Sequence, residues 1–205
     1  MKQRFESLLA ECPVVAILRG ITPCEVKDVC GVLYEKGIRI LEIPLNSPDP
    51  FTSIRIAAAC TQGRMMVGAG TVLTPEDVRK VKEASGTFCI SPNTDPEVIA
   101  EVKKCNMLSM PGFFTASEGF AALKAGADYL KLFPACLGVS YVKDLKAVIK
   151  APIFAVGGVN SGNIREFLTV CAGVGIGRAL YKGGKNLSDL ARDTEEILEN
   201  IRKRK

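Results

Sequence analysis

The sequence contains no histidine, no pair of cysteines spaced C-x-x-C and no apolar run long enough to cross a membrane. Without histidine, and with its eight cysteines scattered along the chain, a zinc site is not expected. Any general acid–base step must then use Glu, Asp, Lys, Tyr, Cys or water. We therefore expect a protein that works without a bound metal.

Features of exported, membrane-bound or nucleic-acid-binding proteins are also missing. Charges interrupt residues 1–10, where a signal peptide needs an unbroken apolar segment. Most cysteines lie beside apolar residues, as small core side chains do in a reducing cytosol; Cys136 is the candidate reactive thiol. The net charge is only +5, no stripe combines basic with aromatic residues, and the basic residues 202–205 end a helical pattern. We expect a cytoplasmic protein that binds neither nucleic acid nor membrane.

Short apolar runs rich in β-branched residues recur about every twenty to twenty-five residues, which is the rhythm of βα units. Eight such runs begin near Val14, Ile38, Met65, Thr87, Met107, Asp128, Ile153 and Ala172. Helical patterns lie between them, and the first has a buried stripe at Val26, Val29, Cys30 and Leu33. Eight strands joined by helix-length crossovers predict a parallel (β/α)8 barrel.

Local signals mark the helix ends. Capping boxes are expected at Thr22-Pro23-Cys24-Glu25, at Thr74 and at Thr115. We expect residues 1–205 to form one domain, in which the segment before Cys12 is an extra N-terminal helix that closes the bottom of the barrel. A doubly wound open sheet is the alternative, although no G-x-G-x-x-G motif follows the first strand.

Lys131 is the most informative residue, because it lies within the apolar run Asp128-Tyr129-Leu130-Lys131-Leu132-Phe133-Pro134. Burial disfavours the charged ammonium, and a lysine with a lowered pKa is a neutral nucleophile that forms Schiff bases with carbonyl compounds. A lysine that extends its amine to solvent is the structural alternative.

Glu42 is the candidate partner of Lys131. Period-two alternation places Ile38, Ile40 and Glu42 on one face of the second strand, and Tyr129, Lys131 and Phe133 on one face of the sixth. If both faces point inward, the carboxylate and the amine meet in the barrel mouth as an acid–base and nucleophile pair. The alternative is a surface carboxylate paired with a helix lysine.

Glycine-rich segments end the seventh and eighth strands, at residues 157–160 (GGVN) and 173–178 (GVGIGR). Glycines let the backbone approach an anion closely, and the loops after strands seven and eight are the usual phosphate site of this fold. Arg178 could add a bidentate contact to the phosphate. Glycines that serve only tight turns are the alternative.

Four motifs resemble the class I KDPG/KHG aldolases: residues 15–23 (VAILRGITP), 42–48 (EIPLNSP), 68–73 (GAGTVL) and 131–134 (KLFP). The LRGITP segment and the EIPLNSP segment are most similar to the branch that acts on 6-phosphogalactonate derivatives, as are residues 91–93 (SPN) and 154–159 (FAVGGV). The similarity extends from about Cys12 to Gly184.

The resemblance implies a homotrimeric barrel with Lys131 as the Schiff-base residue and Glu42 as the acid–base catalyst, acting without a cofactor. It implies a phosphorylated 2-keto-3-deoxy sugar acid as substrate and pyruvate and glyceraldehyde 3-phosphate as products. The substrate-binding residues that it implies are Arg19, Asn46, Thr71, Pro92, Thr115, Gly157, Gly158, Gly177 and Arg178.

Two positions depart from the family pattern. Asn46 stands where gluconate-type members commonly carry arginine, so we expect Arg19 to bind the carboxylate. Arg178 replaces the serine that is usual in the phosphate loop. Three alternatives stay open: cleavage of unphosphorylated 4-hydroxy-2-oxoglutarate to pyruvate and glyoxylate, a phosphosugar isomerase or epimerase that uses Glu42 without a covalent lysine, and a non-catalytic sugar-phosphate binding protein.

Overall fold

The computed structural model describes residues 1–202, and within them the strands form one nine-stranded sheet in which every pairing is parallel. The strands are β1 (Val14–Ile17), β2 (Ile40–Pro44), β3 (Met66–Gly70), β4 (Phe88–Ile90), β5 (Leu108–Met110), β6 (Gly112–Phe113), β7 (Leu130–Leu132), β8 (Ile153–Val156) and β9 (Gly173–Ile176). Their order is β5-β4-β3-β2-β1-β9-β8-β7-β6. Because only Pro111 separates the two end strands along the chain, the sheet curls into a nearly closed barrel.

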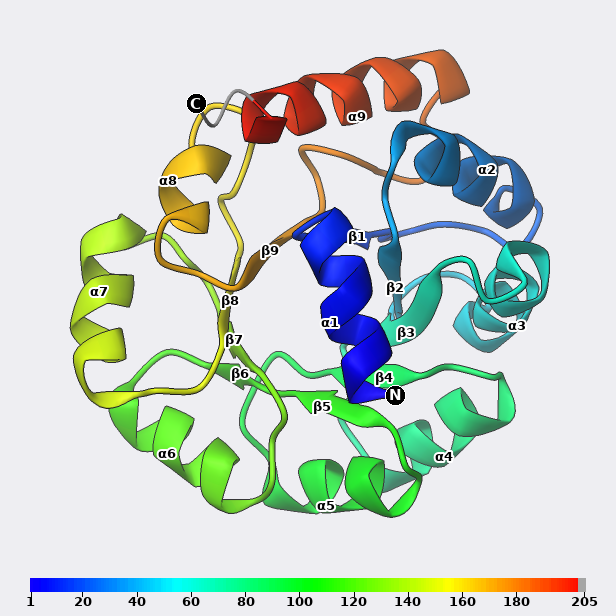
Figure 1. Ribbon diagram of the computed structural model, residues 1–205. Coiled ribbons are helices and arrows are strands. Elements are labelled where there is room, and N and C mark those ends of the chain that lie inside the picture. Colours follow the sequence, from blue (N-terminus) through cyan, green and yellow to red (C-terminus); the bar gives the residue numbers. More distant parts are fainter. Residues whose placement is uncertain (203–205) are drawn as a thin grey trace.

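Helices alternate with the strands, and all of them except the first surround the strands as an outer ring (Figure 1). They are α1 (Lys2–Glu11), α2 (Val26–Lys36), α3 (Pro50–Thr61), α4 (Pro75–Glu83), α5 (Pro96–Lys104), α6 (Ala116–Lys124), α7 (Gly138–Val148), α8 (Ile164–Leu168) and α9 (Leu187–Arg202). An open sheet would carry helices on two flat faces, so the doubly wound alternative is wrong. The architecture is that of a TIM-like α/β barrel.

The predicted capping boxes at Thr74 and Thr115 are confirmed, with Asp77 and Glu118 as the respective reciprocal partners. The box predicted at Thr22 is wrong, because α2 begins later, at Val26. The Glu25 carboxylate does accept from the Thr22 amide, but the Thr22 hydroxyl also donates to that carboxylate instead of accepting from a helix amide.

Apolar side chains pack in two layers. The outer layer lies between strands and helices and contains the predicted α2 stripe, Val26 to Leu33. The inner layer lies inside the barrel and is built from Val15, Ile40, Met66, Phe88, Ile90, Leu108, Met110, Tyr129 and Phe154, together with Phe5 of α1. Ile38 was predicted to face inward with Ile40; it instead lies in the outer layer, because it precedes the start of β2.

Helix α1 crosses one end of the barrel, in front of the strands in Figure 1. Its Phe5 ring is fully buried, and its centroid lies 4.9 Å from that of Tyr129 and 5.8 Å from that of Phe88. This aromatic contact closes the base of the barrel, so a bound molecule must enter from the opposite end.

Four of the eight cysteines are buried, two are half-buried, and Cys24 and Cys136 are exposed, so the prediction of mostly core cysteines is only partly met. Among residues 1–202, no helix is both long and apolar enough to span a bilayer. Of the basic tail noted in the sequence, residues 203–205 lie outside the described residues.

We expect Phe5→Ala to lower the free energy of unfolding by about 3 kcal/mol, the scale for removing a fully buried phenyl ring. Urea denaturation followed by circular dichroism measures the change. Phe120→Ala is the matched control, because the Phe120 side chain in α6 is 48% exposed, and we expect it to cost less than about 1 kcal/mol. Equal losses in the two variants would mean that α1 does not contribute to the core.

Candidate active site

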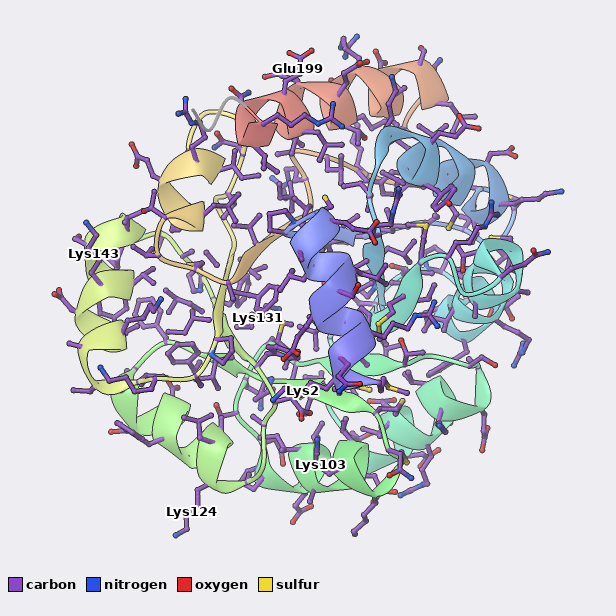
Figure 2. The ribbon with its side chains drawn as sticks, viewed as in Figure 1. Lys2, Lys103, Lys124, Lys131, Lys143 and Glu199 are labelled. Carbon is purple, nitrogen blue, oxygen red and sulfur yellow. The ribbon has the colours of Figure 1, made fainter. Side chains whose placement is uncertain are left out.

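Lys131 is the central residue of β7 and is only 7% exposed. Its backbone pairs with Gly112 of β6 on one side and Phe154 of β8 on the other, and its amide donates to the carbonyl of Pro111. Figure 2 places Lys131 among the barrel strands, whereas Lys124 and Lys143 lie at the periphery of the molecule. The alternative of a lysine that extends its amine to solvent is therefore wrong.

Glu42 lies on β2, across the barrel from β7, since β1, β9 and β8 separate the two strands in the sheet order. Its side chain is 3% exposed. The two groups line one small cavity of about 10 Å³, and its lining consists of Val15, Ile17, Glu42, Ile90, Met110, Lys131, Phe154, Val156 and Gly175. The predicted meeting of the carboxylate and the amine inside the barrel is observed.

Burial dominates the electrostatics of this pair. It raises the pKa of Glu42, against the opposing charges of Lys131 and Arg19. It also lowers the pKa of Lys131, where the Glu42 charge opposes the shift and the Arg19 charge adds to it. Both shifts favour the neutral forms, so the amine is available as a nucleophile and the carboxyl group as a proton carrier.

Two neighbours hold the pair in place. Gly70, the last residue of β3, leaves room for the carboxylate, since a Cβ built on it would clash with Glu42 Oε2. That oxygen accepts no hydrogen bond from the described residues. The amine of Lys131 lies over the ring of Phe133, 4.7 Å from its centroid, a contact that was not predicted from the sequence. A buried oxygen without a donor is suited to exchange a proton with a bound molecule.

Arg19 follows β1 and is exposed, yet its charge acts on both Glu42 and Lys131. The loop is held by Gly20, whose amide donates to the hydroxyl of Ser47 at 2.9 Å. Ser47 is buried and follows β2, next to the exposed Asn46. Ser47 was not among the predicted site residues, because a serine in a Pro-Leu-Asn-Ser-Pro turn gives no signal beyond the turn itself.

Thr71 directly follows β3 and Gly70, and its φ of 57° lies in the left-handed region. A β-branched residue is strained there by about 1–3 kcal/mol, and such strain clusters at functional sites. The backbone conformation therefore adds an independent reason to include Thr71, which was predicted from the resemblance.

The predicted phosphate loops follow β8 and β9. Gly157 and Gly158 both have positive φ, 89° and 87°, and a Cβ on Gly157 would press on the Phe133 ring at 3.2 Å. After β9, the carbonyl of Gly177 accepts from two amides in a tight turn, and Arg178 is exposed within that turn. Both loops thus lie at the same end of the barrel as Arg19 and Thr71, because all strands are parallel.

Two other predicted residues also lie at this end. Pro92 follows β4, where its carbonyl packs against Gly112 so closely that a Cβ there would clash. The Thr115 hydroxyl is engaged as the N-cap of α6, through hydrogen bonds with the amide and the carboxylate of Glu118. The capping role accounts for the hydrogen bonds of the Thr115 hydroxyl, and Thr115 does not line the Lys131 cavity.

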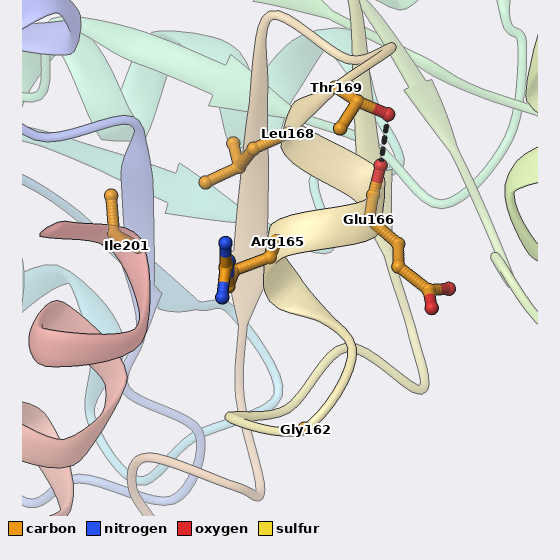
Figure 3. Close-up of a pocket in the computed structure, with 6 residues that line it drawn as sticks. All are labelled: Gly162, Arg165, Glu166, Leu168, Thr169 and Ile201. Atoms are coloured by element: carbon orange, nitrogen blue, oxygen red, sulfur yellow. Dashed lines mark hydrogen bonds between the residues drawn. The ribbon is translucent and has the colours of Figure 1, made fainter. Parts of the chain in front are cut away.

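Other features of the described residues do not resemble this site. Within residues 1–202, no group of three or more Cys, Asp or Glu side chains could hold a metal ion. Cys136 is exposed in the loop between β7 and α7. A larger hollow lies on the outer surface between α8 and α9, lined by Gly162, Arg165, Glu166, Leu168, Thr169 and Ile201 (Figure 3). Its side chains include no buried ionisable group, unlike the barrel cavity.

We expect Lys131 to react with a small acylating reagent at lower pH than Lys124, because burial lowers its pKa. Where Glu42 is ionised, its charge stabilises the ammonium, so Glu42→Gln should move the Lys131 profile to still lower pH. Competitive labelling with acetic anhydride, read by peptide mass spectrometry, measures both profiles, and exposed Lys124 is the internal control. An upward shift in the variant would contradict the coupling of the two groups.

Known proteins are similar to this chain in sequence and in fold. The family model "KDPG and KHG aldolase" matches residues 5–197. A probable 2-dehydro-3-deoxy-6-phosphogalactonate aldolase of Rhizobium meliloti (strain 1021) is 42% identical over 184 residues, 88% of this chain and 87% of the relative. A solved structure described as native KDPGal is 38% identical, with a TM-score of 0.91 over 94% of this chain and 96% of that chain.

A third relative carries information on chemistry. It is a KDPG aldolase from Legionella pneumophila, solved with pyruvate captured at low pH as a covalent carbinolamine intermediate. It is 26% identical, with a TM-score of 0.81 over 95% of each chain. With a family match across nearly its whole length, this chain belongs to the KDPG and KHG aldolase family, as its sequence motifs predict.

Proposed function

We propose that this protein is a class I aldolase that cleaves a 2-keto-3-deoxy-6-phospho sugar acid into pyruvate and glyceraldehyde 3-phosphate. The observation that carries the proposal is the burial of Lys131 beside Glu42 in one cavity, with the pKa of the amine lowered. A neutral buried amine has one chemical use that fits the family, which is the formation of an imine with a ketone.

The first half of the reaction uses Lys131. Its neutral amine attacks the C2 ketone to give a carbinolamine, and the neutral carboxyl group of Glu42 protonates the carbinolamine hydroxyl, which leaves as water to give an iminium ion and a Glu42 carboxylate. The iminium then draws the electron pair of the C3–C4 bond, and that bond breaks as Glu42 removes the proton of the C4 hydroxyl, directly or through water. The aldehyde leaves, and an enamine stays bound to Lys131. The covalent pyruvate in the Legionella relative supports this chemistry.

The second half returns the protein to its starting state. Glu42 donates the proton to the enamine carbon, and water hydrolyses the resulting imine to release pyruvate. A raised pKa suits this carboxyl group, because it must both accept and donate a proton near neutral pH. The protonated imine is the electron sink, so the mechanism uses no metal or other cofactor.

Substrate binding is proposed to divide between the two sides of the barrel mouth. Arg19, Thr71 and Asn46 would bind the carboxylate and hydroxyl groups, with Arg19 as the charged partner because Asn46 carries no charge. Gly157, Gly158, Gly177 and Arg178 would bind the 6-phosphate, since positive-φ glycines and a guanidinium group suit an anion. Pro92 and Thr115 complete the proposed set. The 42% identical Rhizobium relative supports the galactonate type over the gluconate type.

We also propose the finer architecture on which this reaction depends. β5 and β6 would count as one strand interrupted at Pro111, which makes a (β/α)8 barrel with α1 as the extra helix, and residues 1–205 would form a single aldolase domain. A homotrimer in the cytoplasm is the proposed assembly and location, and light scattering after size exclusion would test the oligomeric state.

We expect pyruvate and borohydride together to add one reduced pyruvate per chain, attached to Lys131. Intact mass measures the stoichiometry and peptide mapping identifies the lysine, with Lys131→Arg as the control that should remain unmodified. The absence of an adduct would favour an isomerase, an epimerase or a binding protein. An adduct on another lysine would remove Lys131 from the mechanism.

We expect Glu42→Gln to keep the pyruvate adduct but to lower kcat for cleavage by about 100-fold or more, the scale of general acid–base catalysis. A coupled assay for pyruvate release measures turnover. Unchanged turnover would exclude Glu42 from the proton transfer.

In the same assay, equal kcat/KM for 4-hydroxy-2-oxoglutarate and the phosphorylated sugar acid would favour the unphosphorylated substrate instead.

A further inference from the structure

Glu25 makes more hydrogen bonds than its position at the start of α2 requires. Its Oε2 accepts from the amide of Thr22 at 2.9 Å and from the Thr22 hydroxyl, both in the loop after β1. Its Oε1 accepts from the amide of Gly184 at 2.9 Å and from the hydroxyl of Tyr181 at 3.2 Å, both in the loop after β9. One carboxylate thus joins two loops that are about 160 residues apart in sequence.

Each of these loops carries a cation of the proposed substrate site. The loop after β1 carries Arg19, beside Gly20, and the loop after β9 carries Arg178. Tyr181 ties the second loop further, because its amide donates to the carbonyl of Gly177 at 2.8 Å while its hydroxyl binds Glu25. The Tyr181 ring is 1% exposed, so its position is set by packing.

The two loops also touch directly. A Cβ on Gly183 would lie 2.4 Å from the carbonyl oxygen of Gly20, so only glycine at position 183 permits this approach. Gly20 in turn donates its amide to Ser47 in the loop after β2. Contacts therefore join the loops after the adjacent strands β2, β1 and β9 along the rim of the barrel, through Ser47 and Gly20 and through Glu25 and Tyr181.

We propose that Glu25 is a positioning residue that sets the spacing between the carboxylate-binding and phosphate-binding sides of the substrate site. This inference rests on the proposed function. A substrate with an anion at each end is recognised only when both cations are the right distance apart, and a misplacement of about 1 Å can lower the rate by about 100-fold. Because four donors from two loops bind one carboxylate, the two loops can move little relative to each other.

The charge of Glu25 is suited to this task. Burial raises its pKa, but the hydrogen bonds from Thr22, Gly184 and Tyr181 outweigh that effect and leave the pKa below its ordinary value. The group is ionised at neutral pH, where all four donors find an acceptor. A glutamine has one carbonyl oxygen and an amide that donates, so it satisfies one loop and repels the donors of the other.

The experiment compares Glu25→Gln with Asp95→Ala. Asp95 caps α5 and accepts only from amides of its own helix, Glu97 and Val98, so its loss destabilises a helix start without joining two loops. The readout is the ratio of kcat/KM for the 6-phospho sugar acid to kcat/KM for the same sugar acid without phosphate. We expect Glu25→Gln to lower this ratio about tenfold, the scale of a lost hydrogen bond to a charged group, and Asp95→Ala to leave it unchanged. Tyr181→Phe should lower it less, because it removes one of the four bonds.

A ratio that stays constant in Glu25→Gln and Tyr181→Phe, while thermal stability falls as in Asp95→Ala, would overturn the proposal and leave Glu25 with a structural role only. Hydrogen exchange gives a second measurement that needs no activity. The amides of Thr22 and Gly184 should both exchange faster in Glu25→Ala, which removes both acceptor oxygens, and acceleration in only one loop would also overturn it. If the wild-type protein cleaves neither sugar acid, the proposed function fails, and hydrogen exchange alone then decides whether the two loops are joined.

Discussion

Desolvation of an amine and a carboxyl group inside one closed barrel is the constraint on which the rest of this structure depends. β2 and β7 are separated by three strands in the sheet and lie on opposite sides of the barrel, so Glu42 and Lys131 can approach each other only because the sheet closes on itself. Charged groups are costly in such a place, so burial moves the pKa of Glu42 up and the pKa of Lys131 down, toward the neutral forms. The placement of the proposed catalytic pair therefore follows from the topology as much as from the two residues.

The residues around Glu42 and Lys131 provide the space and the dry surroundings that the two side chains require. Gly70 has no side chain because the Glu42 carboxylate occupies the space that a Cβ would need. The Phe5, Tyr129 and Phe154 rings fill the barrel below, which excludes water from that side and maintains the desolvation. Phe133 contacts both the Lys131 amine and Gly157, so a single ring connects the nucleophile with the proposed phosphate loop.

Much of this arrangement could be predicted from periodicity. Alternation within each strand grouped Glu42 with Ile40 and Lys131 with Tyr129, but it could not say which face is the inner one, because both faces of a barrel strand are buried; the structure shows that both groups point inward. The same rule was wrong for Ile38, since strand ends depend on where the preceding helix stops, and the rule cannot locate that residue. The contacts of Glu25 with Tyr181 and Gly184 could not be predicted, because they join loops at opposite ends of the chain and need the closed barrel to meet.

Depth in the barrel separates the chemistry from the recognition. The proposed catalytic groups are buried, where each electrostatic interaction is strong and each substitution costly. Arg19, Asn46 and Arg178 are instead exposed at the rim, where solvent weakens single contacts. Selectivity at an exposed rim must come from several weak contacts held at fixed separations. A loop framework with strained and close-packed positions, such as Thr71 and Gly183, supplies those separations without adding contacts of its own. A substitution at the rim can therefore alter the proposed selectivity while it leaves the buried pair unchanged.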